Sequence, residues 1–87
     1  MRDIVLNDQA LDDLRYWSLN DIRLLKKIFD LLVNMQRTPF EGLGKPEALK
    51  GDLKGYWSRR INEEHRIVYS VTNISITIIS FRSHDRF

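Results

Sequence analysis

The sequence predicts an α+β fold in which two helices near the start of the chain pack on one face of a β-sheet. Helical spacing of apolar residues is confined to the part of the chain before Thr38. β-Branched and aromatic residues dominate after Tyr56, and a glycine-rich stretch separates the two parts. The predicted order is β-α-α-β-β-β, with a long loop after the second helix, in a single domain spanning residues 1–87.

Length and composition fit one compact globular domain. The chain has 87 residues, of which 43% are apolar and 30% charged. It has no cysteine, which excludes disulfides and thiolate metal sites. The sequence shows neither a signal-peptide pattern nor the roughly 18 consecutive apolar residues of a membrane helix. We therefore expect no membrane association, and a cytoplasmic location.

Positive charge is concentrated in the second half of the chain. The net charge is +2, yet residues 1–43 hold six Lys and Arg against seven Asp and Glu. Residues 44–87 hold eight against five. The second half is therefore where an anionic partner such as RNA is expected to bind.

The predicted first strand and first helix occupy residues 4 to about 20. Ile4 to Leu6 is a short β-prone run, and Asn7 or Asp8 can cap the helix that follows. The apolar stripe of this helix consists of Leu11, Leu14 and Trp17. The residues expected on its opposite, solvent-facing side are Asp12, Asp13 and Arg15.

The second helix is predicted to begin near Asn20 and Asp21 and to end at Thr38-Pro39, because proline disfavours helix continuation. Its apolar residues recur at spacings of three and four. They are Ile22, Leu25, Phe29 and Leu32, with Leu24, Ile28, Leu31 and Met35 widening the stripe.

Residues 40–55 hold all four glycines and are predicted to form a long ordered loop with a helical turn over residues 46–49. Such loops are often functional. Three antiparallel strands are expected to follow, over residues 56–61, 65–71 and 74–81. A three-residue turn at 62–64 would place Arg60 opposite Arg66, whereas a two-residue turn would place them on opposite faces.

The candidate chemical residues lie in the basic half. The sequence shows no nucleophile-elbow, zinc-protease or phosphate-loop motif. Metal-free RNA cleavage needs a base for the 2′-OH, a cation for the phosphorane and an acid for the leaving 5′-oxygen. Residue types suited to these roles are Glu47, Lys50, Lys54, Arg59, Arg60, Glu64, Arg66, Arg82 and His84.

Two long segments, residues 37–50 and 55–69, strongly resemble the YoeB/Txe branch of the RelE-like toxins. Asp12-Asp13 and Tyr16-Trp17 also fit this family. The resemblance implies a RelE-like (microbial-ribonuclease-like) fold, with two helices on an antiparallel sheet. It implies a type II toxin that is a metal-independent, ribosome-dependent endoribonuclease and needs no cofactor. Cleavage of mRNA in the A site would leave a 2′,3′-cyclic phosphate and a 5′-hydroxyl, and so inhibit translation.

The resemblance also assigns roles to individual residues. Glu47 matches the general base, Arg66 the arginine that stabilises the phosphate, and His84 the general acid. Positions expected to bind RNA or phosphate are Lys50, Arg59, Arg60 and Phe87. Glu64 matches a supporting carboxylate that orients the arginines.

One position departs from the family pattern, since Asp85 stands where a tyrosine usually follows the histidine. The missing ring would have stacked on a base, an interaction worth roughly 1–3 kcal/mol. Phe87 is expected to replace that ring if the tail folds back. Asp85 is expected to support a charged His84 if the two side chains approach. The alternative is a weakened homologue that acts mainly in RNA binding or as an antitoxin-bound co-repressor.

The partners implied by the resemblance are a YefM/Axe-like antitoxin, the 70S ribosome with its A-site mRNA, and operator DNA through the antitoxin complex. A homodimer is a further expectation.

Overall fold

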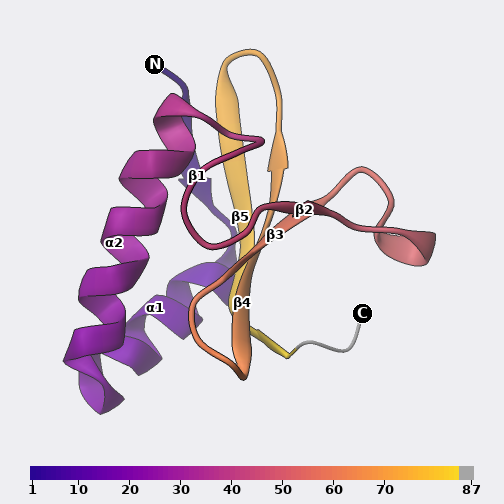
Figure 1. Cartoon of the computed structure of the whole chain (residues 1–87). Coiled ribbons are helices and arrows are strands. Elements are labelled where there is room, and N and C mark those ends of the chain that lie inside the picture. The colour runs from indigo at the N-terminus through magenta and orange to yellow at the C-terminus, as the bar shows by residue number, and fades with distance from the viewer. Residues whose placement is uncertain (85–87) are drawn as a thin grey trace.

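A computed structural model describes residues 1–84 of the chain, which form two helices and a five-stranded sheet (Figure 1). The order along the chain is β1 (Asp3–Leu6), α1 (Asp8–Asn20), α2 (Ile22–Arg37), β2 (Glu47–Ala48), the 3-10 turn η1 (Gly51–Leu53), β3 (Trp57–Arg60), β4 (His65–Val71) and β5 (Ser75–His84). The sheet order is β1-β5-β4-β3-β2. The predicted α+β class and element order are confirmed, with one additional short strand.

The sheet is mixed, so the expectation of a purely antiparallel sheet is wrong. β1 pairs in parallel with β5, with Ile4 opposite Ile76, whereas the other neighbours are antiparallel. The short turns predicted between β3, β4 and β5 do give antiparallel pairs. β1 and its partner β5 are separated in the chain by both helices and the other strands. Such a long connection allows the parallel pairing.

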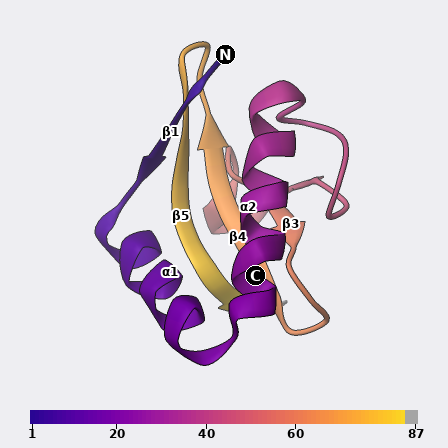
Figure 2. The same cartoon turned by 90° about the vertical axis from the view of Figure 1, so that its left-hand side faces the viewer.

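Both helices cover the same face of the sheet, as Figure 2 shows. The core lies between the helices and the sheet. It consists of Ala10, Trp17, Ile28, Leu31, Leu32, Met35, Ile61, Ile67, Tyr69, Ile76, Ile78 and Phe81. The predicted cap of α1 is present, because the Asn7 side chain accepts a hydrogen bond from Ala10 N. Asp21 caps α2 in the same way by accepting from Leu24 N, at the predicted start of that helix. α2 ends at Arg37, before Pro39, as predicted.

The buried face of α1 differs from the prediction. Leu11 is 58% exposed, whereas Asp13, which was expected in solvent, is 2% exposed. Helical geometry places Ala10, Asp13 and Trp17 on one face, and this is the face that meets the sheet. Because the predicted stripe counted only apolar residues, it missed a carboxylate that is bonded inside the fold.

The segment between α2 and β3 also differs from the prediction. No helical turn forms at residues 46–49, because Glu47 and Ala48 pair with Ser58 and Trp57 as the edge strand β2. The turn lies later, as η1. Figure 1 shows β2 and η1 on the side of the sheet away from the helices. Strand β2 therefore brings residue 47 to the face that the helices leave uncovered.

Candidate active site

Arg66 and Glu47 form an ion pair on the sheet face opposite the helices. Ile67 and Tyr69 belong to the core, so the alternation of side chains along β4 directs Arg66 to the other face. Arg66 Nη1 lies 3.2 Å from Glu47 Oε2. The Glu47 side chain is 62% exposed and that of Arg66 only 11%. The carboxylate is thus accessible from solvent, while the guanidinium is held by the protein.

Ser58 is a third member of this cluster that the sequence interpretation did not include. Its hydroxyl is fully buried and accepts a hydrogen bond of 3.0 Å from Arg66 Nη1. Ser58 is also the register partner of Glu47 across β2 and β3. The alternation along residues 56–61 does place Ser58 on the same face as Arg60. No sequence pattern indicated that Glu47 belongs to the sheet, so this cluster was not predicted.

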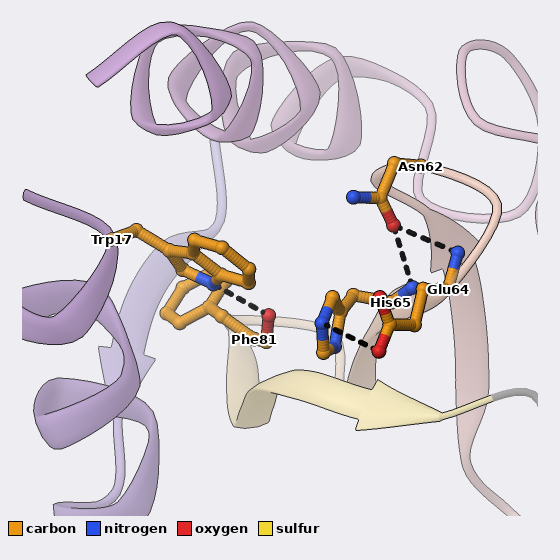
Figure 3. A network of polar contacts seen from close by, with 5 residues as sticks. All are labelled: Trp17, Asn62, Glu64, His65 and Phe81. Atoms are coloured by element: carbon orange, nitrogen blue, oxygen red, sulfur yellow. Dashed lines mark hydrogen bonds and ion pairs between the residues drawn. The ribbon is translucent and has the colours of Figure 1, made fainter. Parts of the chain in front are cut away.

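Arg60 lies directly opposite Arg66, which confirms the three-residue turn. Asn62 holds this turn, because its Oδ1 accepts hydrogen bonds from Glu64 N at 2.9 Å and His65 N at 2.6 Å (Figure 3). Arg60 is exposed and Arg66 is largely buried. Two arginines on one face favour an anionic ligand with several oxygens, such as a phosphodiester.

Arg59 points the other way, and the expectation that it binds RNA is wrong. Its side chain is 0% exposed. All five guanidinium N–H groups have protein acceptors, which are Asn34 Oδ1, the carbonyls of Thr38, Glu41 and Leu43, and Tyr69 Oη. Arg59 therefore fastens the loop after α2 to the sheet and is inaccessible to a ligand.

Tyr69 belongs to the same buried network. Its hydroxyl donates to Pro39 O at 2.8 Å and accepts from Arg59 Nε at 3.1 Å. Burial raises the pKa of Tyr69 above its ordinary value of 10.0, an effect that the hydrogen bond and charge of Arg59 partly oppose. Tyr69 is thus held in its neutral, donating form.

The other predicted site residues come from three further segments of the chain. Lys50 is exposed and immediately precedes η1. Glu64 Oε1 lies 3.8 Å from His65 Nε2, and its side chain is 66% exposed. The backbone of His84 is the register partner of His65, one step from the Arg66–Ser83 pair. The expected roles of Asp85 and Phe87 fall outside the described residues.

Residues 1–84 contain neither a metal-binding cluster nor a membrane-spanning helix. No group of three or more His, Cys, Asp or Glu side chains in this range is arranged to hold a metal ion. Within the same range, neither helix has the length and apolarity needed to cross a membrane.

Two solved bacterial structures share this architecture. The YoeB dimer from Staphylococcus aureus matches with a TM-score of 0.89 and 46% identity, over 95% of this chain and 97% of that one. The YoeB–YefM heterotetramer from the same organism matches with a TM-score of 0.87 and 46% identity, over 97% of this chain and 98% of that one. The fold is therefore that of the RelE-like toxins.

Sequence comparison narrows this class. Toxin YoeB from Escherichia coli strain K12 is 51% identical over 81 residues, which cover 93% of this chain and 96% of that protein. A model of the "YoeB-like toxin of bacterial type II toxin-antitoxin system" matches residues 6–85. The chain belongs to this family, and it is thus a toxin of a type II toxin–antitoxin system.

Proposed function

We propose that the chain is a metal-independent, ribosome-dependent endoribonuclease that cuts mRNA in the ribosomal A site. The observation that carries this proposal is the contact between Glu47 Oε2 and Arg66 Nη1, at 3.2 Å on the uncovered sheet face. It sets a carboxylate that can accept a proton beside a cation that can bind a phosphate oxygen. These are two of the three groups that the reaction needs.

In this mechanism Glu47 removes the proton from the 2′-OH, and the 2′-oxygen attacks the adjacent phosphorus. Arg66 donates hydrogen bonds to the phosphorane oxygens, where negative charge accumulates. As the bond to the 5′-oxygen breaks, His84 supplies a proton to the leaving group. The products are a 2′,3′-cyclic phosphate and a 5′-hydroxyl. Ser58 holds Arg66 in place, while Lys50 and Arg60 bind the RNA backbone and Glu64 supports the charged groups.

Primer extension on mRNA in a purified translation system tests this proposal. Wild type is expected to cut inside A-site codons and to leave the same RNA intact without ribosomes. Glu47→Gln, Arg66→Lys and His84→Gln should each lower the rate by about 100-fold or more, because acid–base groups contribute 10²–10⁴-fold. Ser58→Ala should lower it about tenfold, since Arg66 loses one of its acceptors.

Glu63→Gln is the matched control, because Glu63 is an exposed carboxylate in the 62–64 turn. It should cut at the wild-type rate. Absence of cleavage by folded wild-type protein, or full activity of the Glu47 and His84 variants, would refute the proposed enzyme.

Asp85 favours a second candidate function, a weakened homologue that acts mainly as an RNA-binding protein or co-repressor. An aspartate offers no ring for stacking, and its charge is repelled by phosphate. Asp85→Tyr is then expected to raise the cleavage rate about tenfold or to shift the preferred base. An unchanged rate and an unchanged cutting pattern in the primer-extension assay would eliminate a role for this substitution.

The proposed partner is a YefM/Axe-like antitoxin that holds the toxin inactive in the cytoplasm, and through which the complex contacts operator DNA. Its support is the S. aureus heterotetramer, in which a closely similar YoeB is bound to YefM. The S. aureus dimer supports a homodimer in the same way. Co-expression with a YefM-type antitoxin should relieve growth arrest by wild type, and the two chains should co-purify.

A further inference from the structure

A pocket separate from the Glu47–Arg66 pair lies between α2, the loop after it and the turn that joins β3 to β4 (Figure 2). Its volume is about 450 Å³, which is enough for one nucleotide. Its apolar wall includes Leu31, which is buried, and Leu43, which is 54% exposed. We call it the loop pocket. It offers a flat ligand an apolar surface that solvent can reach.

Three cations line the loop pocket without an anionic partner in the protein. Lys27 comes from α2, Lys45 from the loop and Arg60 from the end of β3, and all three are exposed. Within residues 1–84 none of these side chains takes part in an ion pair, although Asp30 follows Lys27 by only three residues on α2. These cations are therefore available to an anionic ligand.

Two carboxylates also line the loop pocket, and they narrow the class of ligand. Asp30 and Glu63 stand against the three cations, so the lining has a net charge of +1. An acidic peptide would bring further carboxylates close to these two and be repelled. A nucleotide presents a phosphate to the cations, and the amino groups of its base can donate hydrogen bonds to carboxylates. The mixed lining thus favours a nucleotide.

The backbone at Lys45 is strained, which is a second sign of function. Its φ is 53°, and among the residues that the structure describes it is the only one other than glycine with a positive φ. The preceding Gly44 is tightly packed, since a Cβ there would lie 2.9 Å from Leu31 Cδ2. Glycine would relieve the strain at position 45. A lysine in this conformation therefore indicates a use for its charged side chain in the pocket.

Arg60 connects the loop pocket with the candidate active site. It lines the pocket, and its register partner across β3 and β4 is Arg66. Its backbone N also donates to Gly44 O at 2.7 Å, which fastens the pocket's loop to the end of β3. RNA bound at Arg66 therefore passes beside the pocket. Single-stranded RNA is commonly recognised through bases that have left the stack.

We propose that the loop pocket binds one unpaired nucleotide of RNA, with its phosphate on Lys27 and Lys45 and its base against Leu43. The inference rests on the proposed ribonuclease function and deepens it, because it adds a second RNA subsite beside the Glu47–Arg66 pair. The nucleotide comes from mRNA beyond the cut codon or from ribosomal RNA, which share this chemistry.

Amide NMR titration of the full chain with nucleoside 5′-monophosphates tests the proposal. The largest shifts are expected at Leu43, Gly44 and Lys45. Lys27→Ala and Lys45→Asn should each raise the Kd about tenfold, because each removes a charge-assisted contact with the phosphate. Asparagine tolerates a positive φ, so Lys45→Asn should melt no lower than wild type even though it binds more weakly.

Lys26→Ala is the matched control, since Lys26 is the exposed neighbour of Lys27 on α2 and does not line the pocket. Its Kd should stay within about twofold of wild type. Glu63→Gln keeps an acceptor oxygen and should stay within the same limit.

Three outcomes of the titration would overturn the inference. The first is an equal Kd for wild type and both pocket variants. The second is inorganic phosphate binding as tightly as the nucleotides, which would leave the base no part in recognition. The third is a pentaglutamate peptide that binds the pocket more tightly than the nucleotides, which would indicate an acidic protein segment as the partner.

Cleavage on ribosomes identifies the source of the nucleotide. The two pocket variants should raise the KM for ribosomes that carry a long mRNA. A KM increase that persists on an mRNA ending at the A-site codon supports ribosomal RNA, and one that disappears supports mRNA. An unchanged KM on both would overturn the subsite. The titration requires no cleavage, so wild type that binds nucleotides but cuts no mRNA refutes only the proposed enzyme. Cleavage without lysine-dependent binding refutes only the pocket.

Discussion

Arg59 and Arg60 are consecutive in the sequence and have opposite environments. The alternation of side chains along β3 turns them to opposite faces of the sheet, and only Arg59 is buried. Sequence alone did not show which of them is buried, because a buried arginine needs many acceptors at once. Those acceptors come from the loop after α2 and from Tyr69, and only the folded chain brings them together.

Alanine substitutions at these two positions should have very different effects on the stability of the fold. Arg59→Ala leaves several buried carbonyls without their donors and is expected to lower the free energy of unfolding by about 3–5 kcal/mol. Arg60→Ala changes an exposed side chain and should alter it by no more than about 0.5 kcal/mol. Urea denaturation followed by circular dichroism measures both. Equal stability of the two variants would contradict the structural role of Arg59.

At the scale of elements, the bounds of long periodic segments were predicted well and short paired strands were not. The predicted stripe of α2 was partly wrong, because Ile22 and Phe29 are 55% and 51% exposed. Helix α2 has a continuous apolar pattern. It ends at Arg37, just before Thr38-Pro39, because proline disfavours helix continuation. Strand β2 has only two residues, too few to show any periodicity, and it exists because β3 offers a free edge. The position of Glu47 therefore depends on pairing that local sequence does not specify.

The loop after α2 is attached to the sheet through Tyr69, which gives the fold a specific alkaline sensitivity. The raised pKa means that the unfolded chain loses the Tyr69 proton before the folded chain does. This contribution to stability is therefore complete below about pH 10 and is lost as pH rises from there towards the folded pKa.

The stability difference between wild type and Tyr69→Phe should follow this titration. Wild type is expected to be more stable by about 1–3 kcal/mol at pH 7–9, because the variant leaves Pro39 O and Arg59 Nε without their partner. That advantage should shrink above pH 10 by up to about 1.4 kcal/mol per pH unit. Urea denaturation from pH 7 to 11 measures it, and a constant difference across this range would contradict the assigned burial of the hydroxyl.

At the scale of the whole molecule, the two faces of the sheet carry different kinds of side chain. One face packs against both helices, and the other carries Glu47, Arg60 and Arg66. Composition indicated the basic half of the chain but not this division. Sequence alone also did not show that Asp13, far from the basic half, is bonded to β5.

Because binding to RNA releases counterions, cleavage at subsaturating toxin should fall with rising salt. Lys50→Ala and Arg60→Ala should each flatten the plot of log(kcat/KM) against log salt by about 0.7, the value for one contact with a single-stranded phosphate. Lys26→Ala, an exposed change on α2, should leave the slope unchanged. Parallel slopes for all four proteins would remove Lys50 and Arg60 from the proposed RNA contacts.

The parallel pairing of β1 with β5 has a consequence for synthesis of the toxin. β5 lies between β1 and β4, so β1 has no partner strand and β4 is paired only with β3 until residues 75–84 have been made. A nascent chain that stops before β5 has both helices but lacks Phe81, through which β5 is bonded to α1. Folding is therefore delayed until late in translation. A chain that ends before β5 is therefore expected to be inactive, because it cannot complete the sheet that carries the candidate site.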